Sequence, residues 1–309
     1  MHLALVKTLS MGYLLGLVSM TLATLLWRSL RPRLAPQQRA DAGFAVIFGA
    51  FTATWLLAFL IWAGVVRDII YMSTHYFHML MYGGWGAAIT STGGAVMGIS
   101  LLLALVMWLR GRTPRSPSQP LAVVSGLAVL ANEGISTAGL VGCWRPAVWV
   151  NPHYWSHLTD DERGLALAHE RAHLRRRDNL KKLLLQFAAA LYAVLPFSRG
   201  WVKQYELDCE LAVDDHCRES LGDENYARLV ARSAHFALER HAAVASTVAS
   251  GMSHADLKAR LLHLHAPRTP HSKWRGVGTA LSVVVALLPI GLLLSHSVTR
   301  CLLACYLGY

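Results

Sequence analysis

The most chemically informative residues lie in the stretch LALAHERAHLRRRD, where His169, Glu170 and His173 form an H-E-x-x-H motif. Histidines four residues apart share one face of a helix, so their imidazoles can bind a single Zn²⁺ ion. Glu170 stands beside them and can accept a proton from an attacking water molecule. The motif therefore predicts one catalytic zinc ion and hydrolysis of peptide bonds. The alternative is a surface helix that carries two incidental histidines.

A catalytic zinc site needs a third protein ligand, and the acidic stretch YELDCELAVDD offers candidates. Glu210 and Asp214 are four residues apart on one helical face. Glu210 is therefore predicted as the third ligand and Asp214 as a partner that hydrogen-bonds a ligand histidine. Glu206 is the rival ligand. Asp178, at the end of an arginine-rich run, is predicted either to support a ligand in the same way or to be solvated.

The sequence on both sides of the motif predicts the helix and strands that position these residues. Thr159 and Glu162 form a capping-box pair, which predicts a helix start just before the motif. Residues 121–132 have the pattern of strands, and residues 137–150 are rich in β-formers and predict a hairpin. Residues 147–150 are predicted to hold an extended substrate by strand addition.

Composition favours a membrane protein over a disordered chain or an ordinary globular domain. Hydrophobic residues make up 54% of the 309 residues and charged residues only 15%, against about 25% in typical soluble domains. Mean hydropathy is +0.37. The net charge of +11 would suggest nucleic acid in a soluble protein, but basic loops beside membrane helices explain it equally well. With no helix-turn-helix pattern, direct binding of nucleic acid is not expected.

Apolar runs of about 20 residues predict four transmembrane helices. The runs cover residues 8–27, 43–66, 86–109 and 277–295. The apolar residues 180–197 could form a fifth span, but a crossing there would separate the motif from its third ligand. They are instead predicted to form a helix buried against the catalytic helix or lying at the membrane surface.

The predicted fold is a mainly α membrane protein with a cytoplasmic α+β zincin-like metallopeptidase domain between the third and fourth transmembrane helices. Lysine and arginine positions place the N-terminus outside, the peptidase domain in the cytoplasm and the C-terminus outside. The predicted localisation is the inner (plasma) membrane. The predicted domains are a membrane domain at residues 1–110, the peptidase domain at residues 111–276, and the last helix with a short tail at residues 277–309.

Residues 135–215 resemble the BlaR/MecR-type membrane zinc metallopeptidases, the antirepressor family. The matching pieces are GLVGCWRPAVWVNPHYW, LTDDERGLALAHERAHLRRRDNL, NLKKLLLQFAAALYAVLPF and YELDCELAVDD, and NYARLV and DLKARLLHL resemble later helices of the family. By this resemblance, His169, His173 and Glu210 would bind zinc and Glu170 would be the general base. The tail after residue 295 is too short for the family's penicillin-binding sensor domain, so acylation by β-lactams is not expected.

The resemblance implies a membrane endopeptidase that acts in regulatory signalling by cleaving a cytoplasmic transcriptional repressor or itself. Its expected partners are the lipid bilayer and that protein substrate, and the sequence leaves a homo-oligomer open. Two alternatives remain. One is an HtpX-like quality-control protease, although spans usually separate the motif from the third ligand in that family. The other is a non-catalytic membrane signalling protein with a degenerate site.

Overall fold

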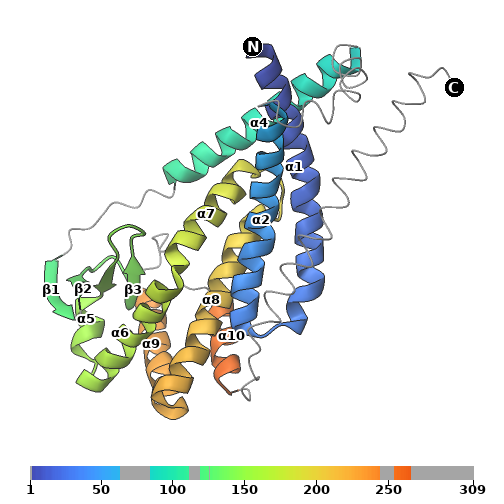
Figure 1. The fold of residues 1–309 in the computed structure, drawn as a ribbon. Helices are drawn as coiled ribbons and strands as arrows, with labels where there is room; N and C mark the ends of the chain where they lie inside the picture. The colour runs from blue at the N-terminus through green and yellow to red at the C-terminus, as the bar shows by residue number, and fades with distance from the viewer. Residues whose placement is uncertain (1, 63–83, 111–118, 125, 244–253, 266–309) are drawn as a thin grey trace.

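Most of the chain is helical, and one small sheet lies beside a bundle of long helices (Figure 1). The computed structural model describes residues 2–62, 84–110, 119–124, 126–243 and 254–265. The first elements are α1 (His2–Leu30), the 3-10 helix η1 (Arg31–Arg33), α2 (Pro36–Trp62) and α4 (Gly84–Arg110). Pro32 and Pro36 suit the tight connection between α1 and α2, because the fixed φ of proline fits the first turn of a helix.

A large apolar core joins the N-terminal helices to α7 (Asp178–Leu191) and α8 (Ser198–Leu221). Tyr13 of α1 stacks on Tyr192, which follows α7, with ring centroids 5.4 Å apart. Trp201 of α8 donates its indole N–H to Thr24 Oγ1 of α1 at 2.9 Å. The bundle therefore holds α7 and α8 in place from the side opposite the sheet (Figure 1).

The prediction of transmembrane helices is wrong for the described part of the chain. No helix there combines the length and the apolar character that crossing a bilayer requires. Part of the apolar side chains of α1 and α2 lies against other helices, and Met20, Trp27 and Val46 belong to the core shared with α7 and α8, whereas Val18, Leu25 and Leu56 are more than half exposed. The fourth predicted span, residues 277–295, lies outside the described residues. The predicted domain boundaries and localisation remain predictions.

The sheet has four strands in the order β1-β2-β4-β3. The strands are β1 (Gln119–Val124), β2 (Leu127–Ala131), β3 (Ala138–Val141) and β4 (Ala147–Val150). β1 pairs antiparallel with β2, β3 pairs antiparallel with β4, and β2 runs parallel to β4. The hairpin predicted for residues 137–150 is confirmed. The predicted role of residues 147–150 in strand addition is wrong, because β4 is an inner strand with partners on both sides.

The helix that carries the motif, α6 (Asp160–Arg176), begins where the capping box predicts. The Thr159 hydroxyl accepts from the Glu162 backbone, and the Glu162 side chain accepts from the Thr159 backbone. One side of α6 packs on the sheet through Leu167. The other side packs on α8 and α9 (Asp223–Ala243) through Ala172. Helix α6 is therefore fixed between the sheet and the later helices.

The turn from α6 into α7 is abrupt. Arg177 adopts a left-handed conformation with φ of 56°, and Asp178 is already the first residue of α7. This turn brings Asp178 back toward the last turns of α6. Helix α7 covers most of residues 180–197, so the predicted helix is present. Leu185 and Ala188 are buried in the core shared with α1, α2 and α8, and not in a cluster with the catalytic helix as predicted.

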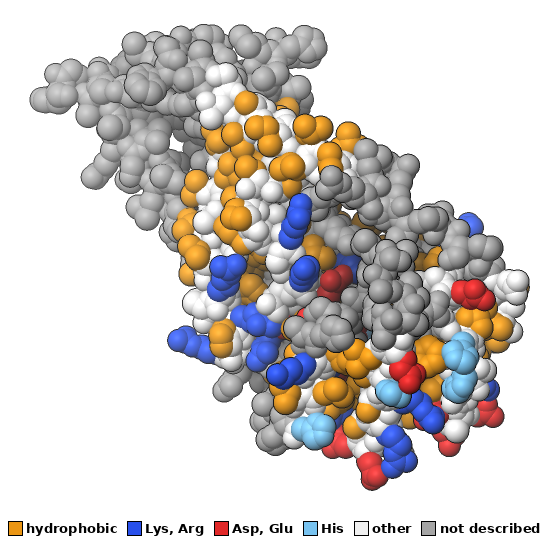
Figure 2. All heavy atoms as spheres, turned by 180° about the vertical axis from the view of Figure 1, so that it is seen from behind, with side chains coloured by type: hydrophobic (Ala, Val, Ile, Leu, Met, Phe, Trp, Pro, Cys, Tyr) orange, Lys and Arg blue, Asp and Glu red, His pale blue; other side chains and the backbone are white. Residues whose placement is uncertain are grey.

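The final described helix, α10 (His254–His265), closes the structure over α8 and α9. Seen from behind, charged side chains gather toward the lower end of the molecule and hydrophobic side chains toward the upper part (Figure 2). Ile99, Leu101 and Leu102 of α4 are among the hydrophobic side chains that are at least half exposed. On this face, the lower part of the described structure therefore carries most of the charged side chains.

Candidate metal centre

The structure brings together the three residues predicted as metal ligands. His169 and His173 of α6 lie with their Nε2 atoms 3.2 Å apart. Glu210 of α8 places Oε2 at 3.5 Å from His169 Nε2 and Oε1 at 3.4 Å from His173 Nε2. All three ligand atoms lie within 4.8 Å of one another. Two imidazole nitrogens and a carboxylate oxygen are donors that divalent transition metals take.

The outer nitrogen of His173 is fixed by a carboxylate. His173 Nδ1 lies 2.9 Å from Asp178 Oδ2, so Asp178 orients the ring and directs Nε2 into the cluster. Asp178 is itself buried and accepts from Arg176 Nε at 3.2 Å and from the Tyr205 hydroxyl at 3.2 Å. Asp178 is therefore a supporting partner of a ligand and not a solvated residue.

The outer nitrogen of His169 is fixed through a tyrosine. The Tyr226 hydroxyl lies 2.7 Å from His169 Nδ1 and donates to Asp214 Oδ1 at 2.6 Å. Since the hydroxyl proton goes to Asp214, the hydroxyl oxygen must accept the proton of His169 Nδ1. That arrangement leaves the Nε2 lone pair of His169 free for a metal. Asp214 lies 3.9 Å from His169 Nδ1, so it supports this histidine through Tyr226 and not by a direct hydrogen bond.

A buried arginine on α10 links the two carboxylates of α8. Arg260 Nη1 lies 2.7 Å from Glu210 Oε2, and Arg260 Nε lies 2.8 Å from Asp214 Oδ2. Burial acts to raise the pKa of Glu210, but Arg260 and His173 outweigh it and hold that pKa well below its ordinary value. Glu210 is therefore an ionised carboxylate, the form that binds a metal.

The electrostatics also affect His173. Burial acts to lower the pKa of His173, but the charge of Glu210 and the hydrogen bond to Asp178 outweigh it and raise that pKa to about 10. A metal ligand must be a neutral imidazole, so metal and proton compete for this nitrogen. Glu170 is also buried on α6 and contributes to the same negative environment around His173.

The rival ligand lies elsewhere. Glu206 forms an ion pair with Lys182 of α7, and it is not part of the cluster. Sequence reasoning missed Tyr226 and Arg260, although the segments NYARLV and DLKARLLHL that carry them were matched to family helices. One signal was available in the sequence. Glu210 and Asp214 lie four residues apart on one helix face, and two carboxylates that pack together in a protein need a positively charged partner such as Arg260.

A comparison with protein families matches residues 122–264 to the family described as BlaR1 peptidase M56. The comparison with curated proteins gives no match. The matched segment runs from β1 to α10 and includes every residue of the cluster and its supporting partners. The resemblance to the BlaR/MecR-type family is therefore confirmed by the match of residues 122–264 to the BlaR1 peptidase M56 family.

Proposed function

We propose that this protein is a zinc-dependent endopeptidase that acts in regulation by cleaving a transcriptional repressor or itself. The observation that carries the proposal is the cluster of His169, His173 and Glu210 inside the segment matched to the M56 peptidases. The family supports peptidase activity and a metal. The choice of zinc and the regulatory role are the further steps proposed here.

Zinc fits the three donors. Tetrahedral ligands at about 2.0–2.1 Å from one zinc ion lie about 3.3 Å from each other. His169 Nε2 and His173 Nε2 are 3.2 Å apart, whereas the two Glu210 contacts use different oxygens, Oε2 at 3.5 Å from His169 and Oε1 at 3.4 Å from His173. One atom from each residue lies within 4.8 Å of the others, so a small shift of the carboxylate would complete the set around one ion. Three protein ligands are also the number found in catalytic zinc sites, which keep a fourth position open.

When bound, zinc supplies Lewis acidity to the scissile carbonyl and to the attacking water. The chain's own residues do the rest. Glu170 follows a ligand without belonging to the cluster, and its carboxylate can take the proton of the water and return it to the leaving amine. Asp178 and Tyr226 hold the ligand rings, while Arg260 keeps Glu210 in place.

The substrate is proposed to be a protein chain. The free edges of the described sheet are β1 and β3, and β3 lies nearer to α6 (Figure 1). Asn179 at the start of α7 donates to the Leu140 and Gly142 carbonyls, which occupies one end of that edge. An extended substrate that adds a strand here would pair with the other end of β3, near Ala138.

Replacing Glu170 with glutamine tests the proposal. The side chain keeps its shape but loses the proton acceptor, so zinc content should stay near wild type while cleavage falls about 10²–10⁴-fold. Cleavage is measured by mass spectrometry of a peptide library and of the protein itself after incubation. Glu206→Gln is the matched control, because it removes a carboxylate on α8 outside the cluster, and it should cleave normally.

Two results would contradict the proposal. If Glu170→Gln cleaves as fast as wild type, Glu170 is not the proton acceptor. If the zinc-loaded wild type cleaves neither the library nor itself, the non-catalytic reading stands. The HtpX-like alternative is weakened by the family match, which is to BlaR1-type peptidases.

A further inference from the structure

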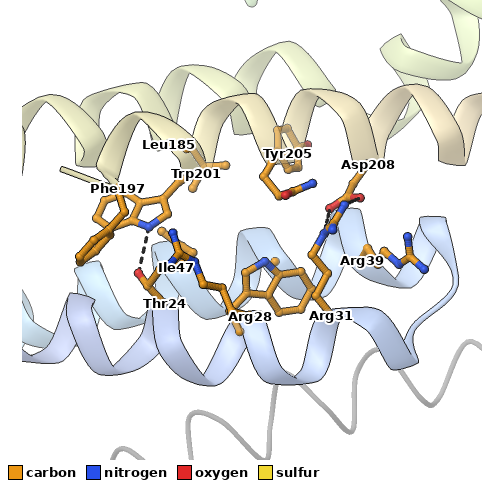
Figure 3. Close-up of a pocket in the computed structure, with 14 residues that line it drawn as sticks. Thr24, Arg28, Arg31, Arg39, Ile47, Leu185, Phe197, Trp201, Tyr205 and Asp208 are labelled. Carbon is orange, nitrogen blue, oxygen red and sulfur yellow. Dashed lines mark hydrogen bonds and ion pairs between the residues drawn. The ribbon is translucent and has the colours of Figure 1, made fainter. Parts of the chain in front are cut away.

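A second candidate site lies in the bundle, between α1, α2 and α8. It is a cavity of about 140 Å³. A cavity of about 150 Å³ accommodates a molecule the size of benzene, so this one has room for a small chemical group but not for a peptide. Figure 3 shows Trp201, Tyr205 and Asp208 along α8 on one wall, with Thr24 and Arg28 of α1 on the wall across from them.

The charges around this cavity do not balance. Three arginines line it, Arg28, Arg31 and Arg39, against one carboxylate, Asp208. Arg31 binds Asp208 through two hydrogen bonds, Nε to Oδ2 at 3.1 Å and Nη2 to Oδ1 at 2.7 Å. Within the described residues, neither Arg28 nor Arg39 forms an ion pair: Arg28 is exposed, and Arg39 donates Nε to the Leu34 carbonyl at 2.6 Å. Burial and the charge of Arg31 lower the pKa of Arg39, as expected where positive charge is in excess.

Aromatic side chains supply the rest of the wall. Arg28 lies over the ring of Phe197, 5.8 Å from its centroid. Trp27 and Trp201 are almost fully buried and also line the cavity. The combination of guanidinium groups and indole rings suits an anion that carries an apolar or weakly polar stem. Guanidinium forks match the oxygens of a phosphate particularly well.

The cavity is connected to the metal centre through α8 and α7. Tyr205 lines the cavity and donates its hydroxyl to Asp178 Oδ1 at 3.2 Å. Asp178 in turn holds His173 Nδ1 at 2.9 Å. In addition, Asp208 of the cavity and Glu210 of the cluster are two residues apart on α8. A ligand that restrains this part of α8 would therefore also restrain two of the three metal ligands, His173 through Tyr205 and Asp178, and Glu210 through α8 itself.

We propose that this cavity binds a phosphate group, free or on a small phosphoester or lipid, and that its occupancy strengthens metal binding at the cluster. The coupling rests on the proposed metal site, whereas the phosphate site itself does not. Coupling of this kind is reciprocal, so metal at the cluster must strengthen phosphate binding by the same factor.

Calorimetric titration of the purified full-length chain at constant ionic strength tests the site, with inorganic phosphate and dihexanoyl-phosphatidic acid as probes. Arg28→Gln and Arg39→Gln should each weaken binding about tenfold. Arg33→Gln is the matched control, because Arg33 is an exposed arginine of the same turn that does not line the cavity, and it should bind like wild type.

Saturable binding of inorganic phosphate supports a soluble phosphate ligand, and binding of the lipid alone supports a headgroup ligand. The site is overturned if wild type saturates with neither probe at about 10 mM, or if Arg33→Gln weakens binding as much as Arg28→Gln.

The coupling is tested by the zinc retained after a fixed challenge with a chelator, with and without the tighter probe. We expect the probe to slow zinc loss about fivefold in wild type and not in Arg28→Gln, which also corrects for any direct binding of zinc by the probe. If the probe changes the rate of zinc loss equally in wild type and in Arg28→Gln, the coupling is overturned. A chain that binds phosphate but never holds zinc contradicts the proposed function and leaves the phosphate site standing.

Discussion

The two histidines of the metal centre are supported in different ways. His173 is hydrogen-bonded to Asp178, a residue five positions later that the α6–α7 turn places beside it. His169 is hydrogen-bonded to Tyr226, which is 57 residues away in the sequence and donates its own hydroxyl proton to Asp214. The first support is local and direct, whereas the second exists only once α8, α9 and α10 have docked. The comparison teaches that half of the centre is built by a turn and half by tertiary packing.

The largest effect should come from the packed half. Arg260→Gln leaves the partly buried Glu210 and the buried Asp214 as neighbouring carboxylates without their cation. We expect the free energy of unfolding, measured by denaturant titration with a chelator present, to fall by about 3–5 kcal/mol. Arg228→Gln removes an exposed arginine from a pair on α9 and should cost less than about 1 kcal/mol. Equal effects would mean that Arg260 does not hold this half together.

The next effect concerns the local half. Asp178→Asn replaces the carboxylate that orients His173 and favours its neutral Nε2 as a metal donor. Zinc affinity, measured by competition with a chromophoric chelator, should fall by about 100-fold, the upper end for the loss of such a partner. Asp41→Asn is the control, because Asp41 also pairs with Arg176 but does not contact a histidine. Unchanged affinity in Asp178→Asn would show that the turn does not set up the ligand.

A smaller effect is expected for the tyrosine. Tyr226→Phe removes the acceptor of the His169 Nδ1 proton while Asp214 keeps Arg260, so zinc affinity should fall by about tenfold. Tyr154→Phe removes a comparable buried hydroxyl that contacts Ser233 away from the cluster, and zinc affinity should not change. If the two variants behave alike, the indirect support of His169 has no role in metal binding.

Sequence reasoning located the local features of the site because they depend on residues close together in the chain. The H-E-x-x-H spacing follows from helical periodicity and the capping box at Thr159 from a local pattern, whereas periodicity alone left Glu206 as a rival to Glu210. Tyr226 and Arg260 could not be found in this way, since their roles arise from the packing of α9 and α10 on α8. Asp214 was placed correctly beside the site, but its contact with the histidine is indirect.

The fold was harder to predict than the site. Hydropathy alone does not tell whether an apolar helix faces lipid or protein, and α1 and α2 bury Met20, Trp27 and Val46 against other helices. Strand order was also outside the reach of local patterns. The segment 147–150 has the composition of an edge or an inner strand alike, and only the parallel pairing of β2 with β4 makes it an inner one.

The central claim, a three-ligand zinc centre in the segment matched to the M56 peptidases, is tested most directly by the zinc content of the purified chain. Elemental analysis should find about one zinc ion per chain in wild type and almost none in His173→Ala, because the remaining two ligands hold zinc too weakly. The fold of the variant is checked by circular dichroism. Stoichiometric zinc in a folded His173→Ala protein, or no zinc in wild type after incubation with the metal, would contradict the account.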